Sequence, residues 1–191
     1  MKRTATVFRL AATALVLTAA MSVPRAWAQS AAETFTATAS VKTAGGDSMT
    51  APVVISITRW TSDAERTTMG AAIKSGGTAA LKKALDAMPD AGTIQVGERK
   101  TPLRFAYSRP VGAGRLVTVA AAQPILYLGA TEAKPKAGFD VALATFQVDA
   151  AGKGTVGELA PAATVKMDAN DAIVVQDYGA EAIRLTVISK K

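Results

Sequence analysis

Alternation of apolar and polar residues is clearest at residues 33–42 (ETFTATASVK), where Phe, Ala and Val alternate with Thr and Ser. A period of two is typical of a strand that has one face in water. Residues 53–60 (VVISITRW) resume a β-rich pattern after a Gly-rich turn. Residues 33–60 are therefore predicted to form a β-hairpin.

The hydrophobic period changes after residue 60. Ser62, followed three residues later by Glu65, is a capping box that marks the start of a helix. The pair Gly76-Gly77 favours a break, and the apolar spacing i, i+3, i+4, i+7 beyond it predicts a second helix. We therefore expect a helical hairpin at 63–88 that docks on a sheet through this second stripe. The stripe consists of Leu81, Ala84, Leu85 and Met88, and its expected partners are Phe35, Leu103, Phe105 and Tyr107.

Short β-rich segments separated by turns fill the rest of the chain, at 93–96, 103–109, 115–121, 125–128, 139–148, 163–167, 172–178 and 182–188. Consecutive short strands favour antiparallel pairing. The predicted fold class is α+β: a mainly antiparallel sheet or open barrel of about eight or nine strands, with the helical hairpin packed on it. No linker or repeat divides the chain, so 29–191 is expected to be a single β-rich domain.

Residues 1–28 have the pattern of a cleaved signal peptide. A cationic start, Lys2-Arg3, precedes an uncharged apolar run at 10–23, and Ala26-Trp27-Ala28 supplies a small-x-small cleavage site. The run is short for a membrane-spanning helix, so no integral membrane anchor is expected after cleavage. A buried N-terminal helix is the alternative. We expect export by the general secretory route to the periplasm or the medium.

Two residue types are missing from the 191 residues: there is no Cys and no His. The lack of Cys excludes disulfides, a thiolate nucleophile and iron–sulfur clusters. The lack of His excludes a Ser-His-Asp triad and the usual zinc sites. The composition therefore removes the commonest catalytic machinery, and no metal or cofactor is predicted.

Lys and Arg number 22 against 15 Asp and Glu, and four of the basic residues lie within residues 1–28. The rest of the chain carries a small positive excess and no basic cluster, which argues against a nucleic-acid partner. Oligomeric state is not predicted.

Two motifs resemble known ligand loops. Residues 152–157 match GxGxxG, but Pro161 lies where the first turns of a dinucleotide-binding helix would run, so a β-hairpin turn is expected. Asp168-Ala169-Asn170-Asp171 resembles the opening of a calcium loop, but Ile173 replaces the Gly that such a loop requires. A polar turn between strands is expected there.

The candidate binding residues are Arg59, Trp60, Tyr107 and Tyr178. Each aromatic side chain combines apolar area with a polar group, which suits the rim of a ligand site. Ala is frequent at positions expected to face the helix–sheet seam, namely Ala37, Ala39 and Ala84, so we expect an incompletely filled apolar pocket there. Arg59 would lie at its mouth and favour an anionic head group. The alternative is that Trp60 simply packs the helices onto the sheet.

Three functions remain open, and the first is an exported non-enzymatic module that binds a small amphiphilic molecule or an envelope partner. The second is a carboxylate-dependent hydrolase acting on a cell-envelope glycan or polymer. The third is a structural envelope protein that uses an exposed sheet edge. An enzyme is the less favoured interpretation. A catalytic pair would come from Asp140, Asp149, Asp171, Asp177 and Glu181.

The segments TFTATASVKTAGG, KPKAGFDVA and VVQDYGAEAIRLT resemble a group of small exported bacterial proteins to which no function is assigned. The resemblance spans most of residues 29–191. It implies export and a single domain, and it gives no indication of an activity or of catalytic residues.

Overall fold

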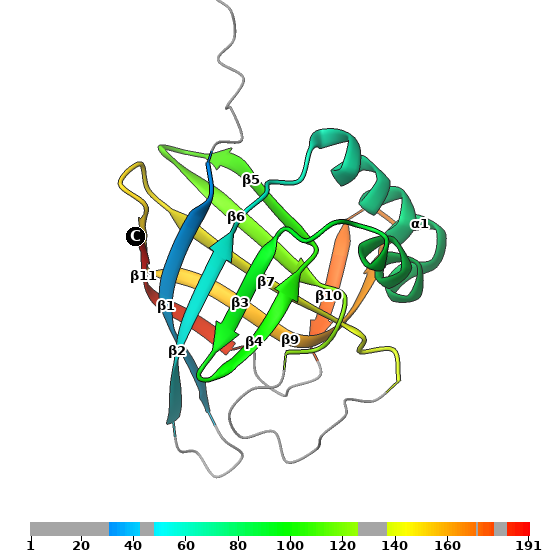
Figure 1. Cartoon of the computed structure of the whole chain (residues 1–191). Coiled ribbons are helices and arrows are strands. Elements are labelled where there is room, and N and C mark those ends of the chain that lie inside the picture. The colour runs from blue at the N-terminus through cyan, green and yellow to red at the C-terminus, as the bar shows by residue number, and fades with distance from the viewer. Residues whose placement is uncertain (1–30, 43–47, 126–136, 171, 178–182) are drawn as a thin grey trace, which may run out of the picture.

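A computed structural model describes residues 31–42, 48–125, 137–170, 172–177 and 183–191 (Figure 1). The expected signal peptide, residues 126–128 of one expected strand, and Tyr178 lie outside this range.

The described chain is a mostly antiparallel β half-barrel with one helix. Nine strands follow one another in the order β4-β3-β2-β1-β11-β9-β7-β6-β5, while β10 pairs with β9 and β8 pairs with β11. The strands are β1 (Glu33–Lys42), β2 (Ser48–Ile57), β3 (Gly92–Val96), β4 (Arg99–Leu103), β5 (Phe105–Val111), β6 (Gly114–Ala121), β7 (Val141–Val148), β8 (Lys153–Gly154), β9 (Val156–Met167), β10 (Ile173–Asp177) and β11 (Ile183–Lys190). The mainly antiparallel sheet or open barrel of about eight or nine strands predicted from the sequence is confirmed as a half-barrel, whereas α+β describes it only loosely, because one helix accompanies the described strands.

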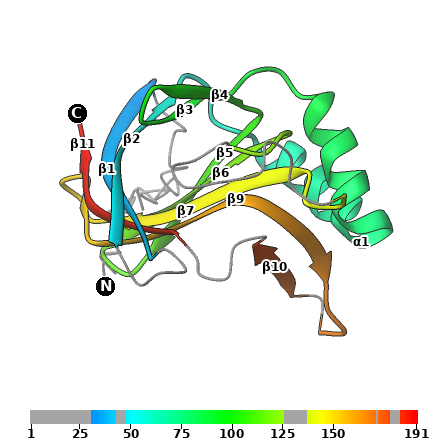
Figure 2. The ribbon, with the colours of Figure 1, turned by 90° about the horizontal axis from the view of Figure 1, so that it is seen from below.

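The two outer strands of this order, β4 and β5, are consecutive in the chain, so the sheet curls until its ends meet at Arg104. The backbone N–H of Arg104 donates to the Ala120 carbonyl of β6 at 2.9 Å. The sheet therefore has a concave inner side and a convex outer side (Figure 2).

The inner side holds the larger of two hydrophobic cores. Side chains from all the long strands meet there, and the largest buried ones include Phe35, Phe146, Ile55, Ile94, Leu103 and Leu159. The rings of Phe35 and Phe146 pack edge to face with centroids 5.0 Å apart. Edge-to-face packing of two aromatic rings is a favourable arrangement, so this pair joins β1 to β7 across the interior.

One helix, α1 (Asp63–Asp86), packs on the outer side of the sheet (Figure 2). Its capping box is present as predicted, because Ser62 and Glu65 satisfy each other's backbone N–H groups. The break predicted at Gly76 and Gly77 is present: both glycines have non-helical φ and ψ, and α1 consists of two helical segments joined by a kink at these residues. Gly77 has a φ of 56°, which is the left-handed region that glycine tolerates best.

The docking surface of α1 forms the second core. Leu81 and Leu85 are buried as predicted, and Ala84 and Met88 pack against the same cluster. The expected sheet partners are only partly right, because Phe105 contacts this cluster whereas Phe35 and Leu103 lie in the inner core. The other partners lie on β6, β7 and β9 and the residues that follow β6, and include Ala120, Ala122, Val141, Ala163 and Val165.

The error about these partners arises at Arg104. Residues 103–109 were expected to be one strand with Leu103 and Phe105 on the same face. Arg104 instead separates β4 from β5. Leu103 therefore points inward and Phe105 points toward α1.

The segment that matches GxGxxG is the hairpin predicted for it. Backbone hydrogen bonds join Asp149 to Lys153 and Gly152 in a tight turn, and β8 and β9 follow. A Cβ at Gly154 would lie 2.0 Å from the Gln147 carbonyl oxygen, so this glycine allows two backbones to approach closely.

Asp168 forms the polar turn predicted between β9 and β10. Its carboxylate accepts from the backbone N–H groups of Asn170 and Ala172 at 2.8 and 2.9 Å. Asp171, the last acid of the calcium-like motif, lies outside the described residues.

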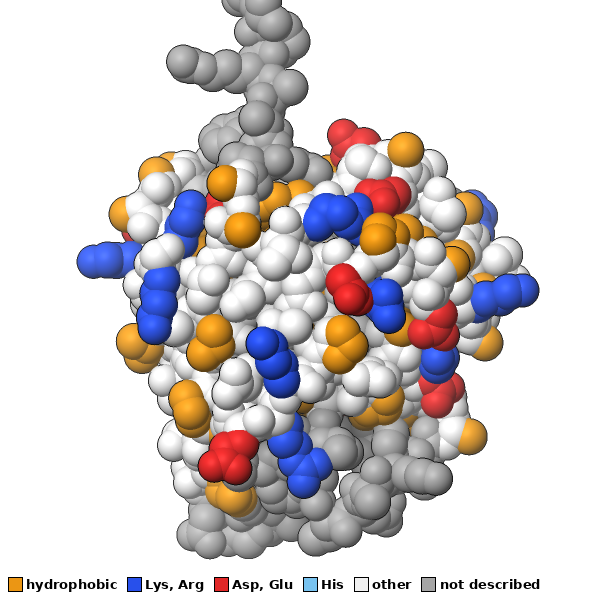
Figure 3. Space-filling model, in the orientation of Figure 1, with side chains coloured by type: hydrophobic (Ala, Val, Ile, Leu, Met, Phe, Trp, Pro, Cys, Tyr) orange, Lys and Arg blue, Asp and Glu red, His pale blue; other side chains and the backbone are white. Residues whose placement is uncertain are grey.

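The surface in Figure 3 has Lys and Arg side chains dispersed among uncharged groups, without a continuous basic patch on this face. Among the described residues, α1 is the one helix, and it is not apolar enough to cross a membrane.

Candidate functional site

Arg59 holds the start of α1. Its guanidinium pairs with the Glu65 carboxylate at 2.9 and 3.0 Å, and a further N–H donates to the Pro89 carbonyl at 3.4 Å. The hydrogen bond from the Ser62 backbone N–H lowers the pKa of Glu65, and the Ser62 hydroxyl and Arg59 lower it further. The cation that was expected to meet a ligand is therefore engaged by the helix cap.

Trp60 is buried in the inner core at one end of the half-barrel, with 8% of its surface exposed. The Arg115 guanidinium lies 5.7 Å from its ring and 5.6 Å from that of Phe35. Arg115 and Lys190 both pair with the buried carboxylate of Glu33. The Trp60 indole N–H has no hydrogen-bond partner in the described part of the chain. Trp60 thus packs the barrel interior rather than the helix–sheet seam.

Tyr107 lies on the outer side of β5 and faces the first turn of α1. Its hydroxyl donates to Asp63 at 2.8 Å, and the Arg66 guanidinium lies 5.2 Å from its ring. The hydrogen bond to Asp63 raises the pKa of Tyr107, because it requires the protonated hydroxyl. Arg59, Trp60 and Tyr107 therefore lie in three different environments, and they do not converge on one pocket.

The helix–sheet seam that was expected to hold the ligand is packed. Met69, Ile73, Leu81 and Leu85 of α1 are all buried against the outer side of the sheet. Ala37 and Ala39, expected to line the same seam, belong instead to the inner core.

A polar pocket of about 180 Å³ lies beside the C-terminal end of α1. Its walls come from the last turns of the helix, the junction of β4 and β5, the residues that follow β6 and the residue before β7. The lining residues are Lys82, Asp86, Pro102, Arg104, Ala122, Gln123, Pro124 and Asp140. We call this the Asp140 pocket. It is of the size of a cavity that holds one benzene-sized molecule, about 150 Å³.

Two charge pairs shape the walls of the Asp140 pocket. Lys82 binds Asp86 one turn later in α1 at 2.7 Å. Arg104 uses Nη1 for both the Met88 carbonyl and the Asp90 carboxylate, each at 3.0 Å. The Nη2 and Nε groups of Arg104 make no hydrogen bond to any described residue. One edge of this guanidinium is therefore available to an acceptor.

Asp140 is the charged group of the pocket that lacks a partner. It is half-buried, and no described residue forms an ion pair or hydrogen bond with its carboxylate. An unpaired carboxylate in a concave site is suited to a cationic group brought by a ligand.

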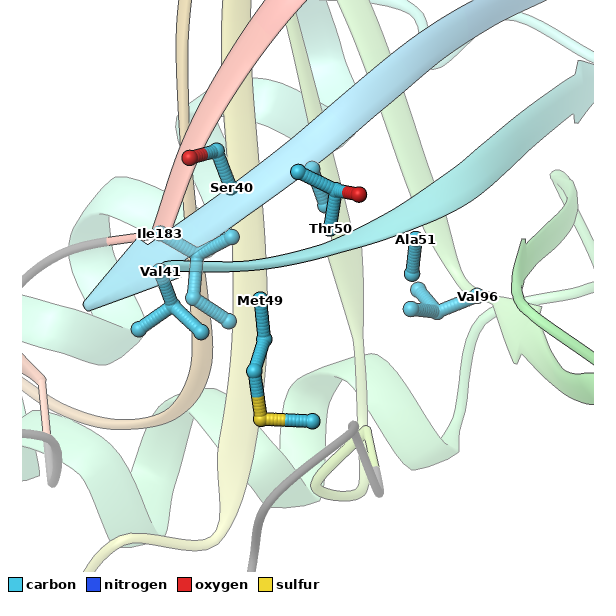
Figure 4. Close-up of a pocket in the computed structure, with 8 residues that line it drawn as sticks. Ser40, Val41, Met49, Thr50, Ala51, Val96 and Ile183 are labelled. Carbon is cyan, nitrogen blue, oxygen red and sulfur yellow. The ribbon is translucent and has the colours of Figure 1, made fainter. Parts of the chain in front are cut away.

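A second, apolar pocket lies at one end of the inner core, lined by Val41, Met49, Val96, Ile183 and their neighbours (Figure 4). The hydroxyl groups of Ser40 and Thr50 lie on the other side of their strands from Met49 (Figure 4). This pocket encloses only about 10 Å³, which is barely the space of one water molecule. It does not hold a ligand without rearrangement of its walls.

Sequence reasoning found Asp140 only as one of five acids, and it missed Lys82, Arg104 and Gln123. Of the other four acids, Asp149 accepts backbone bonds from Ala151 and Lys153 in its turn, and Asp177 is the last residue of β10. Asp171 and Glu181 lie outside the described residues. Within the described ranges, no three acidic side chains are grouped as metal ligands. The one feature of the sequence that could indicate the pocket is the isolated Asp140 before a strand. The other polar residues of the pocket come from distant parts of the chain.

Comparison with protein-family models, curated proteins and solved structures finds no match for this chain.

Proposed function

We propose that this chain is an exported, non-enzymatic module that binds a small amphiphilic molecule in the Asp140 pocket. The observation that carries the proposal is the unpaired, half-buried Asp140 carboxylate in a pocket of about 180 Å³. Pro102, Ala122 and Pro124 supply apolar walls beside the charged groups. The other five of the eight lining residues are charged or polar, and groups of this kind fix the orientation of a small molecule in a concave site.

Ligand-observed NMR tests the proposal with a panel of compounds that join one charged group to a short apolar tail. We expect saturation transfer to at least one of them, with a dissociation constant of about 1 mM or tighter. Gln123 is exposed and lines the pocket, so Gln123→Trp should close it and weaken binding at least about tenfold.

Ala113→Trp is the matched control, because Ala113 is an exposed residue of the β5–β6 turn and does not line the pocket. It should leave binding unchanged. Equal binding to Gln123→Trp, or no binding by any compound of the panel, would overturn the proposal.

A carboxylate-dependent hydrolase is the second candidate, because Asp86 and Asp140 line the same pocket. Two carboxylates facing one substrate can serve as general acid and base. Turnover of a glycan substrate that Asp140→Asn abolishes would favour this candidate over a binding module.

A structural envelope protein is the third candidate, because β10 exposes Ile173, Val174 and Val175 and pairs on one edge only among the described strands. Unprotected apolar edges can recruit another strand. Self-association in light scattering that Val174→Lys abolishes would favour this candidate.

A further inference from the structure

The charges that line the Asp140 pocket differ in how far each is already neutralised. Lys82 and Asp86 neutralise each other at 2.7 Å, and Arg104 shares its Nη1 between Asp90 and the Met88 carbonyl. The Asp140 carboxylate forms no ion pair or hydrogen bond with Lys82, Arg104 or any other described residue. The first requirement on a ligand is therefore a positive group that reaches Asp140.

The second polar feature of the pocket is the available edge of Arg104. A guanidinium presents its N–H groups in a fixed planar fork that matches a carboxylate. Because Nη1 is occupied, the Nε and Nη2 edge is the part that can receive two oxygens side by side. The Gln123 amide, on the same pocket wall, supplies a further donor.

The remaining walls are short and apolar. Pro102, Ala122 and Pro124 leave room for a compact hydrocarbon group, and the volume of about 180 Å³ is sufficient for a ligand of roughly the size of one amino acid.

We infer that the Asp140 pocket binds a small zwitterion of amino-acid type, with its ammonium group on Asp140, its carboxylate on Arg104 and its apolar side chain against the prolines. The inference rests on the proposed function, since it names the ligand class for the same pocket. It replaces the anionic amphiphile expected at Arg59, because Asp140 adds a requirement for a cationic group.

Three compounds with the same branched tail separate the two charged contacts. Leucine carries both groups, 3-methylbutylamine lacks the carboxylate, and 4-methylpentanoate lacks the amine. Titration calorimetry of the full chain should give leucine at least about tenfold higher affinity than either analogue, since each analogue lacks one of the two charge-assisted bonds.

Asp140→Asn keeps the size of the side chain and removes its charge. It should weaken leucine binding at least about tenfold while leaving 4-methylpentanoate unchanged or improved. Arg104→Lys keeps the positive charge and removes the fork, and it should weaken leucine and 4-methylpentanoate but not 3-methylbutylamine. Asp149→Asn is the control, because this exposed acid lies in the β7–β8 turn.

The outcomes separate this inference from the proposed function. Equal affinity of the three compounds, together with loss of binding in Gln123→Trp, would overturn the zwitterion assignment and retain a ligand pocket. The amine binding as tightly as leucine would overturn the role of Arg104. No binding by any of the three, with another compound of the panel bound, would also overturn the assignment.

Discussion

Val187 is the one non-glycine residue with a positive φ in the described part of the chain, at 51°. Two residues of β11, Val187 and Ile188, stand opposite Ala37 of β1, because the register shifts between Thr36 and Thr38. This bulge points Ile188 into the inner core and leaves Val187 74% exposed. A β-branched residue is unfavourable in this conformation, so the bulge is retained at a local cost.

Val187→Asn should therefore stabilise the protein. Asn tolerates the left-handed region, in which other L-residues lose about 1–2 kcal/mol, so we expect the free energy of unfolding to rise by about 1 kcal/mol. Urea titration followed by circular dichroism measures the change. Val156→Asn is the control, because Val156 is 70% exposed on a strand without a positive φ, and should change stability by less than about 0.5 kcal/mol. A loss of stability in Val187→Asn would contradict the interpretation.

At the scale of the elements, α1 depends on its contact with the outer side of the sheet. Leu85 is fully buried there, so Leu85→Ala should lower the free energy of unfolding by about 2–5 kcal/mol. Lys83 is exposed two residues earlier, and Lys83→Ala should change it by less than about 0.5 kcal/mol. Lys82 is not a suitable control, because it pairs with Asp86 and lines the Asp140 pocket. Equal effects of the two substitutions in urea would indicate that α1 is not docked.

Elements were predicted accurately where the residues that determine them lie close together in the sequence. The bounds of β1 were predicted to the residue, because its alternation is contained in the strand itself. The capping box at Ser62 was predicted for the same reason. The break at Arg104 was missed, because it depends on a backbone bond to Ala120 and a side-chain bond to Met88 that form only in the folded sheet.

The Asp140 pocket was missed for a related reason. Arg59 and Trp60 were predicted as binding residues because a cation and an aromatic residue are adjacent where a predicted strand is followed by a predicted helix. Their neighbours in the fold, Glu65 and Arg115, engage them in structural roles. The pocket depends on Lys82, Arg104 and Asp140, which no sequence motif connects.

At the scale of the whole molecule, the edge of β5 that does not pair with β6 is covered by the connection between β2 and α1. Thr61 is completely buried in this connection. Its backbone N–H donates to the Ala106 carbonyl at 2.7 Å, and its hydroxyl accepts from the Ala106 N–H at 3.0 Å. Strand β5 pairs only with β6 in the described sheet, so Thr61 gives its other edge the partner that a further strand would supply.

Thr61→Val tests this coupling, because it keeps the shape of the side chain and replaces with a methyl group the hydroxyl that accepts from Ala106. The buried Ala106 N–H would lose its partner, so we expect the free energy of unfolding to fall by about 1–3 kcal/mol. Thr101→Val is the matched control: Thr101 is 6% exposed, and its hydroxyl makes no hydrogen bond to any described residue. That substitution should be neutral or slightly stabilising. Hydrogen exchange should show faster exchange of the Ala106 amide in Thr61→Val, ahead of the amides of β1 and β2. Unchanged protection of Ala106 would show that the connection does not hold this edge of the sheet.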